Sequence, residues 1–357
     1  MLTSSPPTAS VRPYRPSDAP GVRAVLEATY ADRATPPGLF DWWSFGCPTA
    51  SSGFMVAEID GRLAGVQPME LFDYTDAGRS HRGAMLTGVA VHPEFRRRGV
   101  FSSLLQACER EAWKQGAAFV TSMPNERSRP GFLRAGYTDL GRRELLVRPV
   151  RPVALGAALV PVVGHLAGVA LAAGQALAKT PPPPGRFPVR EARQLPPETQ
   201  DLARRSESLH AGLRIRRTPD WLAWRYLAAP GRSYRLTEVI RGRDEVAGLA
   251  VTVREQRGRL VVSFLMDLLV AVEEVIESLL EAVCVQARNE GAHLVAAVVS
   301  GPRLARDLTR AGFWRVPSWM PLKRFYSVAK FNPDTSHPGH WHTLAGWHQT
   351  LADWDNL

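Results

Sequence analysis

The sequence predicts an α/β (α+β) protein built from two units of similar plan. Segments with the alternating apolar pattern of strands are separated by amphipathic helices, which is typical of sheets covered by helices. The chain has 357 residues, which is long enough for two domains that each bury a core. Its second half repeats the order of elements of the first half in a degraded form.

The first half begins with a strand, a polar turn and a helix between Val11 and Ala31. A hairpin of strands 54–59 and 63–72 follows, and it turns at Asp60-Gly61, a strong two-residue hairpin signal. The next elements are predicted as strand 84–92, helix 102–115 and strand 117–122.

A basic turn joins the strand that contains Val89, Ala90 and Val91 to the helix that follows. Its residues are Arg96, Arg97, Arg98 and Gly99. A helix start presents unpaired N–H groups and the positive end of the helix dipole, and glycine lets a ligand approach the backbone. Ser102 adds a hydroxyl donor just inside the helix. Three arginines alone are typical of a solvated surface turn, but between this strand and this helix they predict a pyrophosphate site.

This stretch resembles the acyl-CoA loop of the GNAT acyltransferase superfamily, in which a strand ending V-x-V is followed by R-x-x-G-x and a helix. The resemblance implies mixed central sheets flanked by helices, in two tandem GNAT-like domains of which the second is degenerate. It implies that a splayed strand binds the pantetheine arm of acyl-CoA and that the turn binds the pyrophosphate. The cofactor-binding residues that it implies are Val89, Ala90, Val91, Arg96, Arg97, Arg98, Gly99, Val100, Phe101, Ser102 and Asn125.

The sequence departs from the family pattern at two positions. Phe101 stands where the family usually has a small residue, although larger residues occur in tandem members. Phe132 stands where family members often place a tyrosine that protonates the departing CoA thiolate. The thiolate then leaves unaided, another group or water supplies the proton, or the chain binds CoA without chemistry. Asn125 has two roles open to it, binding the pantetheine arm and capping a helix.

The second half lacks the basic turn. Its predicted elements are strands 246–255 and 259–270, helix 273–289, strand 293–300 and helix 302–311. The stretch 269–274 has neither arginine nor glycine, and Glu273 and Glu274 would repel a pyrophosphate at the helix start. The second unit is therefore predicted not to bind CoA.

The domains are predicted as 1–150 (acyl-CoA-binding), 151–188 (apolar helical segment and proline-rich linker), 189–330 (degenerate GNAT-like) and 331–357 (C-terminal tail). Residues 153–178 carry no charge and are long enough to span a bilayer. Their Ala and Gly content and Pro161 favour a buried or interdomain helical hairpin over a membrane span, with a membrane-surface role between the two.

Composition narrows the choice of partners. The net charge is +10, but no nucleic-acid-binding motif is present, and an excess of arginine also suits a phosphate-rich cofactor. Three scattered cysteines predict neither disulfides nor a metal site, and the histidines His340, His342 and His348 lack supporting ligands. The first residues do not form a signal sequence, so we expect a cytoplasmic location. The oligomeric state stays open.

The resemblance implies an N-acetyltransferase that moves an acetyl group from acetyl-CoA directly to an amine. The predicted general bases are Glu70, on a strand facing the cleft, and Asp267, in the second unit. Two other function classes stay open, a non-catalytic acyl-CoA-binding or regulatory protein and a membrane-associated acyltransferase. The acceptor class is also open among polyamine-like or aminoglycoside amines, peptide N-termini and cell-envelope sugars.

Overall fold

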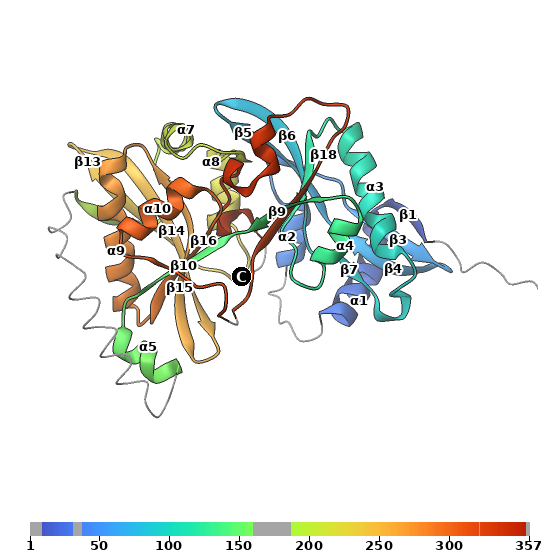
Figure 1. The fold of residues 1–357 in the computed structure, drawn as a ribbon, viewed down its shortest axis with the longest axis horizontal. Coiled ribbons are helices and arrows are strands. Elements are labelled where there is room, and N and C mark those ends of the chain that lie inside the picture. Colours follow the sequence, from blue (N-terminus) through green and yellow to red (C-terminus); the bar gives the residue numbers. More distant parts are fainter. Residues whose placement is uncertain (1–8, 31–37, 160–186, 321, 355–357) are drawn as a thin grey trace, which may run out of the picture. The chain divides into compact units, whose positions relative to one another are not determined.

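The computed structural model describes residues 9–30, 38–159, 187–320 and 322–354. The chain forms two compact units, and neither is one continuous piece of sequence (Figure 1). Of the described residues, the first unit contains 9–30, 38–75, 79–142 and 324–344, and the second contains 76–78, 143–159, 187–320, 322–323 and 345–354.

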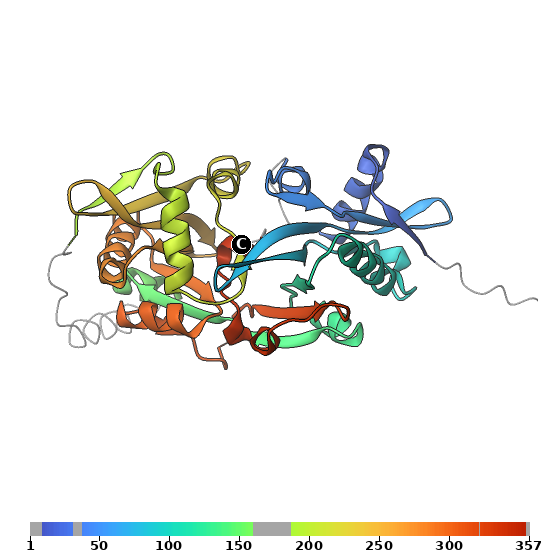
Figure 2. The same ribbon diagram turned by 90° about the horizontal axis from the view of Figure 1, so that it is seen from above.

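One sheet of the first unit is covered by a helix on each face (Figure 2). Its strands, in order, are β1 (Ser10–Pro13), β3 (Met55–Ile59), β4 (Arg62–Gln67) and β7 (Ala90–Val91). Val56 packs in one cluster with Val22 of α1 (Ala19–Thr29), and its neighbour Ala57 packs in another with Leu104 of α3 (Val100–Lys114). Successive residues of a strand point to opposite faces, so β3 contributes to both clusters.

The other sheet of the first unit carries the strand that leads toward the basic turn. Its order is β5 (Met69–Asp76), β6 (Arg79–Leu86), β8 (Phe119–Ser122), β18 (Tyr326–Phe331) and β9 (Thr138–Arg142), with β2 (Ala50–Ser52) beside β5. β6 and β8 are parallel, whereas β18 is antiparallel to both of its neighbours. The helices α2 (Leu39–Phe45) and α4 (Arg129–Arg134) complete the unit.

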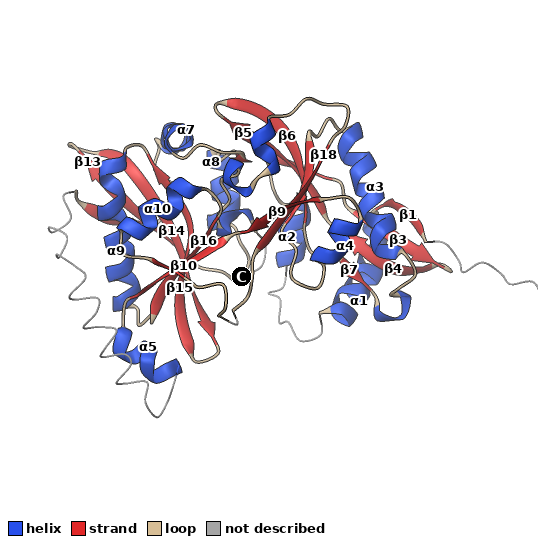
Figure 3. Cartoon of the chain, in the orientation of Figure 1, coloured by secondary structure: helices blue, strands red, loops and turns tan. Residues whose placement is uncertain are grey.

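Strands of the second unit form a large mixed sheet (Figure 3). Its order is β11 (Val189–Ala192), β13 (Tyr234–Arg241), β14 (Glu245–Arg257), β15 (Leu260–Val270), β16 (Leu294–Val299), β10 (Glu144–Pro149) and β17 (Trp314–Arg315). The helices are α5 (Pro152–Leu159), α7 (Thr199–Leu209), α8 (Pro219–Leu222), α9 (Ile276–Asn289) and α10 (Pro302–Arg310). Apolar residues of α9 and α10 and the strands beneath them form one buried core.

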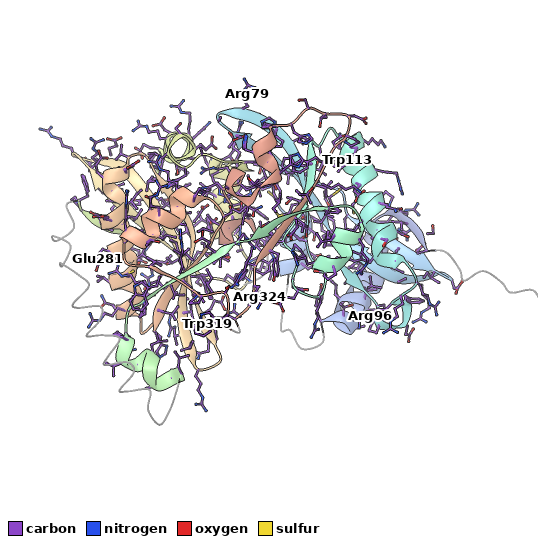
Figure 4. All side chains as sticks on the ribbon, viewed as in Figure 1. Arg79, Arg96, Trp113, Glu281, Trp319 and Arg324 are labelled. Atoms are coloured by element: carbon purple, nitrogen blue, oxygen red, sulfur yellow. The ribbon has the colours of Figure 1, made fainter. Side chains whose placement is uncertain are left out.

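Two strands pair in sheets that their sequence position does not predict. β10 lies within the predicted domain 1–150 but pairs between β16 and β17, and Arg148 on it forms an ion pair of 2.6 Å with Glu281 of α9 (Figure 4). β18 lies at the end of the predicted domain 189–330 but pairs between β8 and β9. Each strand thereby finds partners on both edges. The compact units are therefore built from separate segments of the chain, and the division into domains 1–150, 151–188, 189–330 and 331–357 stays a prediction.

The predicted class, mixed sheets flanked by helices, is confirmed. The hairpin turn at Asp60-Gly61 is also confirmed, since both residues adopt positive φ. Two predicted strands are each broken in two: residues 63–72 at Pro68, and residues 84–92 at Gly88. Trp221 and Trp224 are buried in the second unit.

The apolar stretch 153–178 lies mostly outside the described residues, which include only its beginning, in α5. None of the helices that the structure describes has the length and apolar character needed to cross a membrane.

Residues 345–354 belong to the second unit, and their titratable side chains are buried. His348 is buried with its ring 5.5 Å from that of His210, whose Nε2 lies 3.1 Å from Asp307. Burial lowers the pKa of His348 well below its usual value, and Arg214, His210 and Arg217 lower it further. The folded protein therefore holds His348 neutral.

We predict that this histidine makes stability depend on pH. Unfolding exposes His348 to water, where its pKa is about 6.5, so the unfolded chain binds a proton that the folded chain rejects. The stability that depends on neutral His348 is fully present above pH 6.5 and is lost as the pH falls below that value. The free energy of unfolding then decreases by up to about 1.4 kcal/mol per pH unit. Denaturant unfolding between pH 7 and pH 5 measures this slope. His348→Gln flattens it, and an unchanged slope in that variant contradicts the assignment.

Candidate functional site

In the first unit, one strand leaves its neighbour. β6 pairs with β8 as far as Leu86, opposite Ser122. The chain then passes through Gly88, whose φ of 52° is readily adopted by glycine, and resumes as β7, which pairs with β4. β7 is the last strand of its sheet, so within the described residues one of its edges has no strand partner.

Backbone groups of Val89 and Val91 face this unpaired edge. The N–H of His92 donates to the carbonyl of Ala64 on β4 at 2.9 Å. Because the backbone groups of successive residues in a strand point to opposite edges, the N–H and C=O groups of Val89 and Val91 point away from β4. The last turn of α1 reaches the same edge. The Tyr30 hydroxyl donates to the Val89 carbonyl at 2.7 Å, and the Thr29 hydroxyl lies 3.4 Å from the Val91 carbonyl.

The basic turn follows directly and exposes its three guanidinium groups. Arg96, Arg97 and Arg98 form no ion pair with any described residue, and Figure 4 labels Arg96 in this turn. The buried ring of Phe95 anchors the turn, and the guanidinium of Arg98 lies over it at 5.6 Å. Since the glutamate of the turn, Glu94, is paired with Arg62, the free charge here is positive.

The turn ends at the start of α3 with two residues in the left-handed region. Gly99 has a φ of 76°, and Arg97 has a φ of 64°, which is uncommon for a residue with a Cβ. The first helical bond recorded at this end runs from Ser103 N–H to Gly99 O at 3.0 Å. The N–H groups of residues 100–102 precede it and have no intrahelical acceptor. Such a helix start, beside three cations, suits a phosphate.

Asn125 and Phe132 lie after the end of β8. The Asn125 side-chain oxygen accepts from the N–H groups of Arg127 and Ser128 at 2.9 and 3.0 Å in the turn before α4, whose N-cap is Ser128, and leaves its amide nitrogen as a donor. The Phe132 ring is buried, 5.4 Å from the ring of Phe101. Gly131 makes room for this bulky pair, because a Cβ there would come within 2.7 Å of the Phe101 ring.

The structure brings Glu70 to the strand break. Glu70 lies on β5 with only 1% of its surface exposed, and its carboxylate accepts a hydrogen bond of 3.2 Å from the Thr87 hydroxyl. Sequence reasoning missed Gln67, whose amide nitrogen donates to the carbonyls of Pro68 and Thr87 at 2.7 and 2.9 Å. The sequence feature that could have indicated this site is the presence of Gln67 and Glu70 in an otherwise apolar predicted strand.

The second unit contains a similar divergence, but the chain itself occupies it. β15 and β16 pair in parallel as far as Leu265, opposite Ala297. Beyond that point the end of β16 bonds the C-terminal segment: Ser300 N–H donates to Gln349 O at 3.1 Å, and Gln349 N–H donates to the Ser300 hydroxyl at 2.7 Å. Backbone groups at the point where the strands diverge are thus hydrogen-bonded by another segment of the same chain.

Asp267, the second predicted base, is part of this closure. Its carboxylate lies 2.7 Å from Arg217, which also pairs with Asp353 at 2.8 Å, and it accepts from the hydroxyls of Tyr226 and Thr350. Burial lowers the pKa of Arg217, but the two carboxylates outweigh burial and raise it. These contacts give Asp267 a structural role in the second unit.

The start of α9 carries the opposite charge to the start of α3. Glu273 and Glu274 precede α9, and Glu273 is paired with Arg303. No group of three or more histidine, cysteine or carboxylate side chains in the described ranges could hold a metal ion.

We predict that Arg97→Gly stabilises the fold. A left-handed conformation costs a residue with a Cβ roughly 1–2 kcal/mol, and the greater freedom of unfolded glycine offsets part of the relief. The expected gain in free energy of unfolding is about 1 kcal/mol by denaturant titration. Arg98→Gly removes the same charge at a residue outside the positive-φ set, and no gain is expected there. Equal effects of the two variants would contradict the strain at Arg97.

Comparison with known proteins agrees with this geometry. Residues 10–138 match a family model described as an acetyltransferase (GNAT) domain. The sequence has no significant match among curated proteins.

Similar folds occur in solved structures. A GCN5-related N-acetyltransferase from Anabaena variabilis ATCC 29413 aligns with a TM-score of 0.62 and 12% identity, over 90% of this chain and 72% of that one. N-myristoyltransferase from Saccharomyces cerevisiae, with bound myristoyl-CoA, aligns with a TM-score of 0.60 and 11% identity, over 95% and 85%. The identities are too low to indicate more than the fold. Residues 10–138 thus match a GNAT acetyltransferase domain, and the rest of the chain is similar to these proteins in fold.

Proposed function

We propose that the first unit binds acetyl-CoA and that the protein transfers the acetyl group to the amine of a small molecule or peptide. The single observation that carries the proposal is the unpaired edge at Val89 and Val91, which leads directly into the exposed arginines and the start of α3. Backbone groups at the edge suit the amides of a pantetheine arm, and the turn suits a diphosphate. The family model's description supports an acyl-CoA donor.

Different groups along this edge would bind different parts of acetyl-CoA. Arg96, Arg97 and Arg98 with the first N–H groups of α3 hold the phosphates, and the amide of Asn125 offers a further donor to the pantetheine arm. The Val89 N–H binds the reacting carbonyl oxygen as it gains negative charge. Bound acetyl-CoA supplies the activated thioester, and holding it beside the amine provides much of the acceleration.

An amine acceptor must lose a proton before it attacks. Glu70 is the proposed base, because its buried carboxylate lies at the strand break, hydrogen-bonded to Thr87. It takes the ammonium proton directly or through one water. Asp267, which is buried and ion-paired with Arg217 at 2.7 Å, is the less suitable of the two predicted carboxylates.

The second candidate is a protein that binds acyl-CoA without transferring the acyl group. The observation that favours it is Phe132, which has no proton to give and is buried away from solvent. This candidate shares the binding site with the first and differs only in lacking turnover.

A binding and thiol-release experiment tests the proposal. Acetyl-CoA and myristoyl-CoA are each offered with spermidine, kanamycin, a peptide with a free N-terminus and glucosamine. We expect CoA binding by calorimetry and acceptor-dependent thiol release with acetyl-CoA. CoA binding without thiol release for any pair of acyl donor and acceptor supports the second candidate. Absence of CoA binding rejects both candidates.

Charge reversal in the turn checks where CoA binds. Arg97→Glu with Gly99→Glu puts two carboxylates against the phosphates, and because charge-assisted hydrogen bonds contribute about 1.5–3 kcal/mol each, affinity falls at least roughly tenfold. Arg110→Glu, an exposed position on the same helix, is the matched control and changes affinity by less than about threefold. Equal losses in the two proteins would move the site away from the turn.

A further inference from the structure

Acyl transfer from a thioester leaves a thiolate, and residue 132 cannot protonate it. The Phe132 ring is 1% exposed and packs between Phe101 and Tyr137, at ring distances of 5.4 and 5.1 Å. Tyr137 does not replace it. Its own side chain is buried in the same core, and burial raises the pKa of its hydroxyl well above the usual value.

Tyr30, at the end of α1, places a phenol hydroxyl at the backbone edge formed by Val89 and Val91. It caps the C-terminal end of α1, is half-buried, and donates to the Val89 carbonyl at 2.7 Å. Val89 is the first residue after the break at Gly88, where the proposed site holds the thioester. Among the other tyrosines described in the first unit, Tyr14 packs on Phe45 and Tyr74 on Phe119, and the Tyr326 ring is covered by the Arg129 guanidinium at 4.6 Å.

Resting on the proposed function, we propose that Tyr30 is the catalytic acid that protonates the departing CoA thiolate. The amine nitrogen forms its bond to the acetyl carbon and loses its second proton to water, the carbon–sulfur bond breaks, and the sulfur keeps the electron pair. The Tyr30 O–H turns from the Val89 carbonyl to the sulfur and transfers its proton. The phenolate then takes a proton from water, which restores the starting state.

The test compares Tyr30→Phe with wild type, using acetyl-CoA and the best acceptor of the amine panel. The variant keeps the ring and loses only the hydroxyl. General acids contribute on the order of a hundredfold or more, and the low basicity of a thiolate reduces this, so we expect kcat to fall at least about tenfold. The Kd of CoA by calorimetry is expected to change by less than about threefold.

Two comparisons separate proton transfer from positioning. Thr29→Val removes the neighbouring hydroxyl of the same edge, at the Val91 carbonyl, and a smaller loss of kcat is expected there. The oxygen-ester analogue of acetyl-CoA has a more basic leaving group, so the loss caused by Tyr30→Phe should be larger with it than with the thioester. A hydroxyl that only positions the strand would lower both rates by the same factor.

The outcomes distinguish this inference from the proposed function. Wild-type turnover with an unimpaired Tyr30→Phe variant overturns the acid assignment and leaves the acetyltransferase proposal intact. Equal losses with both donors, or equal losses in the Tyr30 and Thr29 variants, overturn it as well. Wild-type protein that binds CoA and releases no thiol overturns both.

Discussion

A strand that leaves its neighbour exposes backbone N–H and C=O groups that need new partners. In the first unit this happens after Leu86, where β6 ends beside β8 and β7 continues beside β4. The break positions the Val89 edge, the carboxylate of Glu70 and the hydroxyl of Tyr30 around one short piece of chain. The basic turn and α3 come directly after β7 in the chain. The proposed binding site therefore depends on where the pairing of β6 with β8 ends.

The second unit shows the alternative solution to the same problem. There the chain's own C-terminal segment bonds the end of β16 and reaches Asp267 on β15 through Thr350. Breaking a buried pair such as Arg217 and Asp267 typically costs several kcal/mol, so the closure is strongly held. With glutamates at the start of α9, the charge there also disfavours phosphate. One unit therefore has an edge suited to a ligand, and the other is closed by protein.

Much of this was predictable from local sequence. The basic turn, the helix after it and the hairpin at Asp60-Gly61 depend on short-range chemistry, and their residues lie together in the structure. The sequence also predicted the contrast between the two helix starts. Glu70 was predicted from its residue type and its strand, and the structure adds its contact with Thr87.

Long-range pairing was not predictable in the same way. Nothing in the composition of β10 or β18 says which sheet it joins, because both are short strands whose partners lie far away in the sequence. Tyr30 was missed for a related reason. Its role depends on α1 ending beside Val89, a contact between residues 59 positions apart. The break between β6 and β7 was missed because Gly88 does not by itself signal a change of partner.

The most direct measurement of this account is hydrogen exchange at the Val89 and Val91 amides with and without CoA, in the intact protein. Pantetheine bound along the edge predicts that both amides exchange at least about tenfold more slowly at saturation. Unchanged exchange at Val89 and Val91, in protein that calorimetry shows to be saturated with CoA, would contradict the account.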